Sequence, residues 1–325
     1  MKKRNKIIIL VASFLIAIVV IVYFAVGNYF YEYALDAKDE KEFMDDNPHL
    51  EESIAVNADV AEAAELADAN FKEQHPSTSM SIVSNDKLKL NLEADLYEND
   101  DADGQKWAIV VHGYTSKAAN MTRYVRNFYE QGYNVLAPDL RGHGDSEGDY
   151  IGMGWHDRLD LLQWIDEVIK LDANAEIVLF GVSMGGATVM MASGEELPSN
   201  VKVIVEDCGY SSVSEVFTYQ LDDLFGLPEF PIINAASTVA NFRAGYDLYE
   251  ASAVKQVAKS KTPMLFIHGD ADTFVPFEML DKVYEAANVE KEKLIIAEAG
   301  HADSEKVNPE LYWNTVWGFV GKYIQ

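Results

Sequence analysis

The chain opens with an apolar run and continues as an alternation of strand-like and helix-like stretches. Residues 7–26 are uncharged over 20 consecutive positions. As a helix this run would be about 30 Å long, the thickness of a bilayer's hydrocarbon core. Residues 79–84 and 88–97 alternate apolar and polar side chains around Asn85-Asp86, a pattern that predicts a β-hairpin. Residues 107–111 are apolar throughout, as expected of a strand that is buried on both faces.

Beyond this strand, short apolar runs alternate with amphipathic stretches. We predict further strands at 134–137, 177–180, 201–205, 264–268 and 293–297, and helices at 121–131, 155–171, 277–287 and 310–323. The alternation predicts an α/β fold, with a doubly wound, mostly parallel sheet of eight strands and helices on both faces. Ligands of such sheets bind beyond the carboxyl ends of the strands.

One region breaks the alternation. Residues 208–258 are too many for a single crossover helix and are rich in large apolar side chains, so we predict a small helical cap there. Some of these side chains are candidates for lining an apolar substrate pocket, namely Phe217, Leu221, Leu224, Phe225 and Phe242. The alternative is that they only bury themselves against the helices of the sheet.

The chain before the sheet divides into two parts. We expect residues 1–27 to be a transmembrane helix and signal anchor, because four basic residues precede the apolar run and aromatic residues crowd its end. The basic flank places the bulk of the chain outside the cytoplasm, and a cleaved, secreted form is the alternative. Residues 28–77 are predicted to be an acidic stalk with a helix at 57–74, or a segment that packs on the domain at 78–325.

Charge and cysteine content narrow the possible partners. The chain has 26 basic against 53 acidic residues, a formal net charge of −27 at pH 7. Such a charge argues against nucleic acid as a partner. It also repels anionic membrane surfaces, so we expect membrane contact only through the N-terminal helix. The single cysteine, Cys208, allows no intramolecular disulfide, and no pair of His or Cys stands at ligand spacing. We therefore predict neither a metal site nor a cofactor.

The candidate chemistry is arranged around Gly181-x-Ser183-x-Gly185. A predicted buried strand runs into this pattern and a helix follows it. A sharp strand-to-helix turn holds its serine in a strained backbone conformation, and the flanking glycines let the two elements approach closely. Ser183 is therefore the candidate nucleophile, and the amide of Met184 is a candidate donor to a developing oxyanion.

A serine nucleophile needs a general base and a third group that orients the base. Asp270 and Asp272 follow the predicted strand at 264–268, and His301 follows the predicted strand at 293–297. All of these residues lie at strand ends, where side chains from neighbouring parallel strands converge. Composition and spacing alone do not choose between the two aspartates.

From about Ser79 to the C-terminus, the chain resembles the α/β-hydrolase superfamily, in the group of serine aminopeptidases and monoacylglycerol lipase-like enzymes. The shared patterns are His112-Gly113, Pro138-Asp139-x-Arg141-Gly142-His143-Gly144-x-Ser146, the Gly181 to Gly185 turn, His268-Gly269-x-x-Asp272-x-x-Val275-Pro276, and Gly300-His301. The resemblance implies Ser183 as nucleophile, Asp272 as the orienting acid and His301 as the base. It also implies an oxyanion hole formed by the amides of Tyr114 and Met184.

Together these observations predict a membrane-anchored, extracytoplasmic serine hydrolase that cleaves carboxylic esters through an acyl-enzyme. Its expected partner is a small-molecule ester or acyl substrate. A serine aminopeptidase, or an acyltransferase or thioesterase, is the alternative on the same fold. A non-catalytic binding protein is the alternative of another class, and the presence of acid and base at triad positions argues against it.

Overall fold

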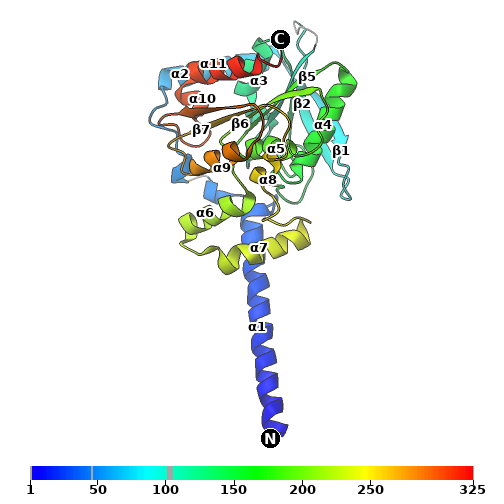
Figure 1. Cartoon of the computed structure of the whole chain (residues 1–325), viewed down its shortest axis with the longest axis vertical. Coiled ribbons are helices and arrows are strands. Elements are labelled where there is room, and N and C mark those ends of the chain that lie inside the picture. Colours follow the sequence, from blue (N-terminus) through cyan, green and yellow to red (C-terminus); the bar gives the residue numbers. More distant parts are fainter. Residues whose placement is uncertain (1, 45–46, 101–104, 325) are drawn as a thin grey trace.

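The computed structural model describes residues 2–44, 47–100 and 105–324, and its centre is one eight-stranded sheet (Figure 1). The strands are β1 (Thr78–Val83), β2 (Asn91–Tyr97), β3 (Lys106–Val111), β4 (Asn134–Pro138), β5 (Glu176–Val182), β6 (Val201–Asp207), β7 (Met264–Gly269) and β8 (Lys291–Ile296). Their order is β1-β2-β4-β3-β5-β6-β7-β8. Only β2 runs against its neighbours among these strands, so the predicted eight-stranded, mostly parallel sheet is confirmed.

The helices follow the predicted alternation. They are α1 (Lys2–Leu35), α2 (Ala58–Gln74), α3 (Thr122–Glu130), α4 (Asp157–Leu171), α5 (Met184–Ala192), α6 (Val213–Phe225), α7 (Glu229–Arg243), α8 (Ala253–Val257), α9 (Glu278–Ala286), α10 (Ser304–Val307) and α11 (Pro309–Val320). Each helix predicted from periodicity is present within a few residues of its expected bounds, as α2, α3, α4, α9 and α11.

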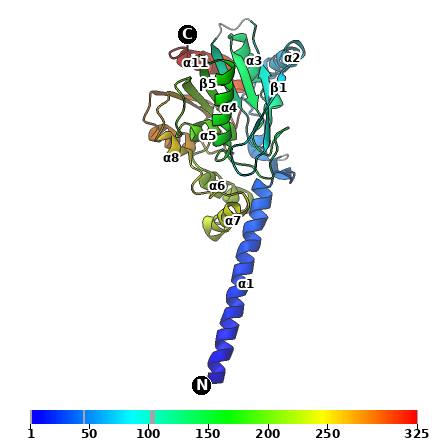
Figure 2. The same cartoon turned by 90° about the vertical axis from the view of Figure 1, so that its right-hand side faces the viewer.

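Two apolar layers hold the helices on the sheet (Figure 2). On one face, α3 and α11 bury side chains such as Phe128 and Phe319, and α2 packs on α3. On the other face, α4 and α5 bury Trp164 and Met190, with α8 and α9 beside them. Helices with one apolar stripe cover both faces, so the strands between them are apolar on both sides.

The cap consists of α6 and α7, which lie beyond the carboxyl ends of the strands (Figure 1). Helix α8 packs instead against α5 and α9 in the helix layer of the sheet. The structural cap is therefore shorter than the predicted 208–258. Residues before α6 and after α7 return the chain to the sheet.

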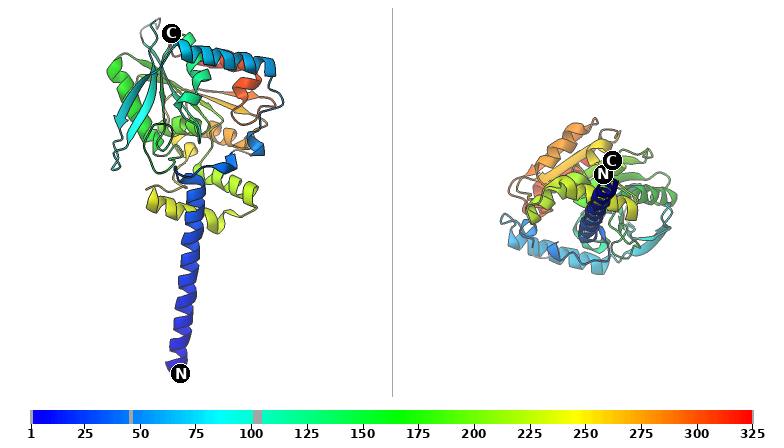
Figure 3. Two further views of the ribbon diagram at one scale, coloured as in Figure 1. Left: turned by 180° about the vertical axis from the view of Figure 1, so that it is seen from behind. Right: turned by 90° about the horizontal axis from the view of Figure 1, so that it is seen from below.

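The described residues of 28–77 pack on the domain and do not form a separate stalk. Helix α1 is long and apolar enough to cross a membrane, and its most apolar part is exposed. Its end is buried, with Tyr31 2% and Leu35 1% exposed. The chain then crosses the domain to α2, where Phe71 is buried in the apolar layer of α3 and α11 (Figure 3). Of the two expectations for residues 28–77, the packed segment is the observed one.

Candidate active site

Ser183 lies at the topological switch point of the sheet, where the strand order reverses. The chain passes from β3 to β4 on one side and then to β5 on the other, so the carboxyl ends of β3 and β5 border a crevice. Ser183 follows β5 directly, and α5 begins at the next residue. Its backbone has φ 57° and ψ −118°, a conformation that residues other than glycine rarely adopt. The sharp turn predicted from Gly-x-Ser-x-Gly is present.

Both glycines of the turn are required by close backbone contacts. A Cβ atom on Gly181 would lie 2.2 Å from the carbonyl oxygen of Gly185, and one on Gly185 would lie 2.1 Å from that of Val111. Any side chain at either position would push α5 away from β5 or β3. The amide of Ser183 donates to the carbonyl of Asp207 at 2.8 Å, which ties the turn to β6.

Three residues from distant parts of the chain meet at the turn. The Oγ atom of Ser183 lies 2.8 Å from Nε2 of His301. Nδ1 of the same imidazole lies 2.8 Å from Oδ2 of Asp272. The geometry allows His301 to take the serine proton at Nε2 while the carboxylate holds Nδ1–H, the arrangement of a serine triad.

Asp272 is held as an ionised acceptor. Its Oδ1 accepts from the amides of Phe274 at 2.9 Å and Val275 at 2.8 Å, and its Oδ2 also lies 3.2 Å from Nε2 of His268. Burial alone would raise the pKa of Asp272, but His301 and His268 outweigh burial and hold the pKa below its ordinary value. The carboxylate can therefore stabilise an imidazolium without taking up a proton itself.

Asp270, the other candidate acid, faces away from the site. It is exposed, and its Oδ1 accepts from the amide of Glu298 at 2.7 Å. This bond joins the loop after β7 to the loop after β8. The geometry thus distinguishes two aspartates that spacing alone does not.

The loop that carries His301 is bound to the N-terminal segment. Ser53 donates from its amide and its Oγ to Oδ2 of Asp303, both at 2.8 Å, and its Oγ accepts from the amide of Gly300 at 2.7 Å. Ser53 therefore connects the residue before His301 with the residue two positions after it. Sequence reasoning missed this contact, because Ser53 lies in no motif and its partners are about 250 residues away.

The candidate oxyanion donors flank the serine. A Cβ on Gly113 would lie 3.3 Å from Cβ of Ser183, so the chain at the end of β3 passes directly beside the serine. Tyr114 follows Gly113, and Met184 begins α5, so backbone from both sides of Ser183 reaches the place where an oxyanion would form. The Tyr114 hydroxyl points away and donates to the carbonyl of Ala34 at 2.8 Å.

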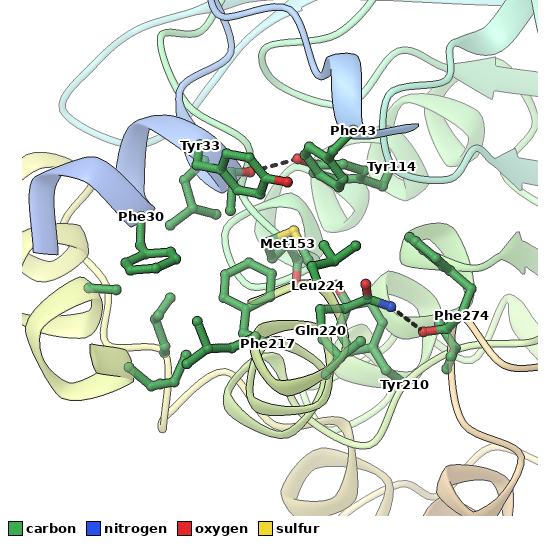
Figure 4. Close-up of a pocket in the computed structure, with 18 of the residues that line it drawn as sticks. Phe30, Tyr33, Phe43, Tyr114, Met153, Tyr210, Phe217, Gln220, Leu224 and Phe274 are labelled. Carbon is green, nitrogen blue, oxygen red and sulfur yellow. Dashed lines mark hydrogen bonds between the residues drawn. The ribbon is translucent and has the colours of Figure 1, made fainter. Parts of the chain in front are cut away.

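An apolar cavity adjoins Ser183 on the cap side (Figure 4). Phe217, Leu221, Leu224 and Phe225 of α6 line it, at positions that share one helix face. Phe242 is not among the lining residues. It is 90% exposed near the end of α7, so its assignment to the pocket is corrected.

Several polar groups of the cavity wall bind to the protein itself, while the buried Oε1 of Gln220 has no hydrogen-bond partner among the described residues. Besides the Tyr114 hydroxyl, the Tyr210 hydroxyl donates to the carbonyl of Met153 at 3.0 Å. Nε2 of Gln220 donates to the carbonyl of Phe274 at 2.7 Å. What these side chains offer the cavity is therefore mostly apolar surface, which suits a hydrocarbon chain.

Part of the cavity wall comes from α1 and the residues after it, namely Phe30, Tyr33, Ala34, Leu35 and Phe43. In Figure 4, Phe30 and Tyr33 project from the end of α1 toward the cavity. Sequence reasoning assigned the aromatic residues at this place to the membrane interface. Their spacing signals an apolar face, but nothing local indicates that the cap covers that face.

A second, more polar cleft meets Ser183 from the opposite side. Its lining includes Gly113, Ser116, Arg123, His301 and Lys306. Ser183 thus stands between an apolar cavity and a polar cleft. A substrate with one apolar and one polar part could place its scissile bond at this junction.

His112, another residue of the shared patterns, supports a loop rather than chemistry. Nε2 of His112 accepts from the amide of Leu140 at 2.9 Å, and its Nδ1 donates to the carbonyl of Gly113 at 2.7 Å. Burial, together with the neighbouring His143, lowers the pKa of His112 to about 3. Both ring nitrogens are engaged and the ring is neutral, so His112 fixes the backbone next to the serine.

Within the described residues, one cluster could offer three ligand atoms to a metal ion: Cys208, Asp272 and His301. Asp272 and His301 are already hydrogen-bonded to each other, and His301 is also hydrogen-bonded to Ser183. Cys208 is buried, and burial raises the pKa of its thiol, which opposes the thiolate form that metals require. The cluster therefore fits a triad better than a metal centre.

The chain is similar in sequence and in fold to several known proteins. A family described as "Serine aminopeptidase, S33" matches residues 103–206. The uncharacterized protein YqkD of Bacillus subtilis is 31% identical over 215 residues, which are 65% of this chain and 70% of YqkD. The uncharacterized membrane protein YNL320W of Saccharomyces cerevisiae is 23% identical over 194 residues, 59% of this chain and 63% of that protein. Among solved structures, the esterase PF2001 of Pyrococcus furiosus is 25% identical with a TM-score of 0.62, covering 78% of this chain and 94% of the esterase.

Proposed function

The chain belongs to the α/β-hydrolase superfamily and its serine aminopeptidase S33 family, and on this premise we propose that it is a serine hydrolase that cleaves carboxylic esters. The observation that carries the proposal is the hydrogen-bonded series Ser183–His301–Asp272 at the edge of an apolar cavity. We propose further that α1 anchors the enzyme in the membrane with the catalytic domain outside the cytoplasm. The basic residues before the apolar run support this orientation.

The proposed reaction has two halves. His301 Nε2 takes the proton of Ser183 Oγ as the oxygen attacks the ester carbonyl, and Asp272 stabilises the resulting imidazolium. The amides of Tyr114 and Met184 would donate to the oxyanion. Collapse of the tetrahedral intermediate expels the alcohol, which receives the proton from His301. A water molecule, deprotonated by His301, then attacks the acyl-enzyme, releases the carboxylic acid and returns the proton to Ser183.

The lining of the apolar cavity favours a hydrocarbon acyl chain over a charged amino terminus, whereas the polar cleft is lined by acids that include Glu65 and Asp68. An aminopeptidase needs an acid that holds the substrate's ammonium group. No acidic side chain lines the apolar cavity in the described part of the chain. Of the cap acids, Glu215 pairs with Lys282, and Asp223 lies 2.9 Å from Nε2 of His49. A hydrocarbon acyl chain matches this cavity better than a charged amino terminus does.

Replacing the nucleophile tests the proposal. In full-length protein, Ser183→Ala is expected to lower ester turnover by about 10⁶ if chemistry limits the rate, as in other serine triads. The parent protein should react covalently with a small fluorophosphonate, and the variant should not. Melting temperature provides the control for folding. Turnover by the variant close to the parent rate would place the nucleophile elsewhere, and an unreactive, inactive parent would reject the proposed function.

A further inference from the structure

The membrane helix and the substrate cavity form one continuous structure. Helix α1 extends without interruption from Lys2 to Leu35, so it continues well past Val26, where the apolar run ends. Phe30, the first cavity-lining residue of α1, is only four residues beyond Val26, which is about 6 Å along a helix. The cavity wall therefore begins within one or two helical turns of the segment that fits inside a bilayer.

The cap contacts α1 just past the end of its apolar run. Helices α1 and α7 cross at Gly27, where a Cβ atom would lie 2.4 Å from the carbonyl oxygen of Ala235. Below the crossing, the hydroxyls of Tyr23 and Thr238 are 3.0 Å apart. The cap therefore sits beside the end of the membrane-spanning segment, as the ribbon in Figure 1 also shows.

Charged groups fasten the other end of α7. Arg243 donates to Oδ1 of Asn28 at 2.8 Å and pairs with Glu32 and Asp36 at 3.2 Å and 3.1 Å. Its guanidinium also lies over the ring of Tyr31, 4.2 Å from the centroid. Several contacts between α1 and α7 thus hold the cap and the anchor in one orientation. The part of the cavity wall that these helices form together therefore keeps its shape.

Aromatic side chains of α1 and α6 meet beside the cavity. The ring of Phe225 lies 5.4 Å from that of Phe30 and 5.3 Å from that of Tyr33. Phe225 is 36% exposed, and on α7 Phe230 is 75% and Phe242 is 90% exposed. Exposed aromatic rings next to the end of a membrane span are typical of side chains that enter the bilayer interface.

We propose that the end of α1 is a wall of the substrate site as well as an anchor, and that the substrate is an acyl ester resident in the bilayer, which reaches Ser183 between α1 and α6 of the cap. This inference rests on the proposed function and names its substrate class. The cavity accepts the acyl chain from the membrane side, and the polar cleft on the other side of Ser183 accepts the alcohol part. An apolar chain that moves from lipid into this cavity never has to cross water.

Substitutions in α1 test the wall. Full-length protein is placed in phosphatidylcholine vesicles, because the acidic chain would repel anionic lipid, and receives p-nitrophenyl butyrate or p-nitrophenyl palmitate. Ala34→Trp fills the cavity and should lower the palmitate-to-butyrate ratio of kcat/KM by about tenfold or more. Phe30→Ala removes a ring and should move the ratio in the opposite direction. Ala25→Trp, the same change on an exposed part of α1, is the matched control and should leave the ratio unchanged.

The source of the substrate is tested with two sets of vesicles. Palmitate ester in the vesicles that carry the enzyme should be cleaved about tenfold faster, or more, than the same ester supplied in separate vesicles without enzyme. Equal rates would overturn entry from the bilayer.

An unchanged ratio in both Ala34→Trp and Phe30→Ala, with fluorophosphonate still labelling Ser183, would overturn the role of α1 as a wall of the site while leaving the proposed function intact. If Ala34→Trp fails to fold and is not labelled, Phe30→Ala alone decides the wall. Absence of both ester cleavage and labelling in the parent would instead reject the proposed function and this inference with it.

Discussion

His268 and His301 share one carboxylate, but only His301 reaches Ser183. Nε2 of His268 lies 3.2 Å from Oδ2 of Asp272 and 3.0 Å from the carbonyl of Val275, and its buried Nδ1 has no hydrogen-bond partner among the described residues. Burial lowers the pKa of His268, but Asp272 outweighs it, so the net direction is upward. A second histidine therefore helps to keep the catalytic carboxylate ionised. This contribution to stability is present above the ordinary pKa of an aspartate and is lost as pH falls through the lowered pKa of Asp272.

Two aspartates two residues apart should respond differently to the same change. Asp272→Asn should lower turnover by about 10⁴, because an amide presents N–H to His301 and favours the wrong tautomer. It should also lower the melting temperature, since the buried ion pairs with both histidines are lost. Steady-state rates and thermal melting of the full-length variants measure both effects.

Asp270→Asn is the matched control for that change. The exposed Asp270 keeps an oxygen that can accept from the amide of Glu298, so rate and melting temperature should both stay near the parent values. An inactive, folded Asp270→Asn together with a normally active Asp272→Asn would show that the orienting acid is the other residue.

At the residue scale, the sequence predicts position best where a side chain is tied to local backbone. Ser183 lies in a strand-to-helix turn that two glycines announce, and the predicted lining residues of α6 repeat along one helix face. The prediction that Phe242 lines the pocket is wrong, because aromatic character alone does not tell which side of a helix faces the cavity. Its predecessors Val239 and Ala240 are buried, whereas Phe242 points outward.

At the scale of elements, the stretch between α1 and α2 acts as a strap over the active-site loops. It contains two short 3₁₀ helices, Glu42–Met44 and Pro48–Leu50. From the second of these, Nδ1 of His49 lies 2.7 Å from the hydroxyl of Thr273, next to Asp272. Ser53 then binds both sides of His301. The stretch has no regular periodicity and its partners are remote, so pattern analysis could not place it.

We expect Ser53 to be a positioning residue for His301. Ser53→Ala leaves Oδ2 of Asp303 and the amide of Gly300 without their hydroxyl partner, which costs about 1 kcal/mol per lost hydrogen bond. A loosened histidine should lower kcat and the rate of fluorophosphonate labelling by about tenfold, with KM little changed. The assays are run well below the melting temperature of the variant, so that global unfolding does not contribute.

Two further variants separate positioning from general stability. Ser53→Thr keeps a hydroxyl and should restore most of the rate. Ser77→Ala removes a serine that binds Asp95 on the exposed face of the hairpin, and should leave kcat unchanged. Equal labelling rates in Ser53→Ala and the parent would show that the strap stabilises the fold without positioning the base.

At the scale of the whole molecule, the N-terminal residues are integrated with the domain they precede. The apolar run, its basic flank and its length are visible in the sequence and indicate a membrane span. That the same helix continues into the substrate cavity is a tertiary fact, set by the crossing of α1 and α7 at Gly27. Small residues at a helix crossing permit this approach, but a single glycine in an apolar run does not predict a partner.

The orientation of the whole molecule is the last prediction. Because basic residues flank the start of α1, that end should remain in the cytoplasm, and the domain at 78–325 should face outward. Protease added to intact cells should therefore remove the domain, while a cytoplasmic marker protein stays intact. Gly27 packs against Ala235 of the cap, so cleavage after residue 27 would cut α1 where it contacts α7. An uncleaved anchor is thus expected, and the chain should fractionate with membranes at its full length. Protection of the domain from protease, or a secreted form lacking residues 1–27, would contradict this topology.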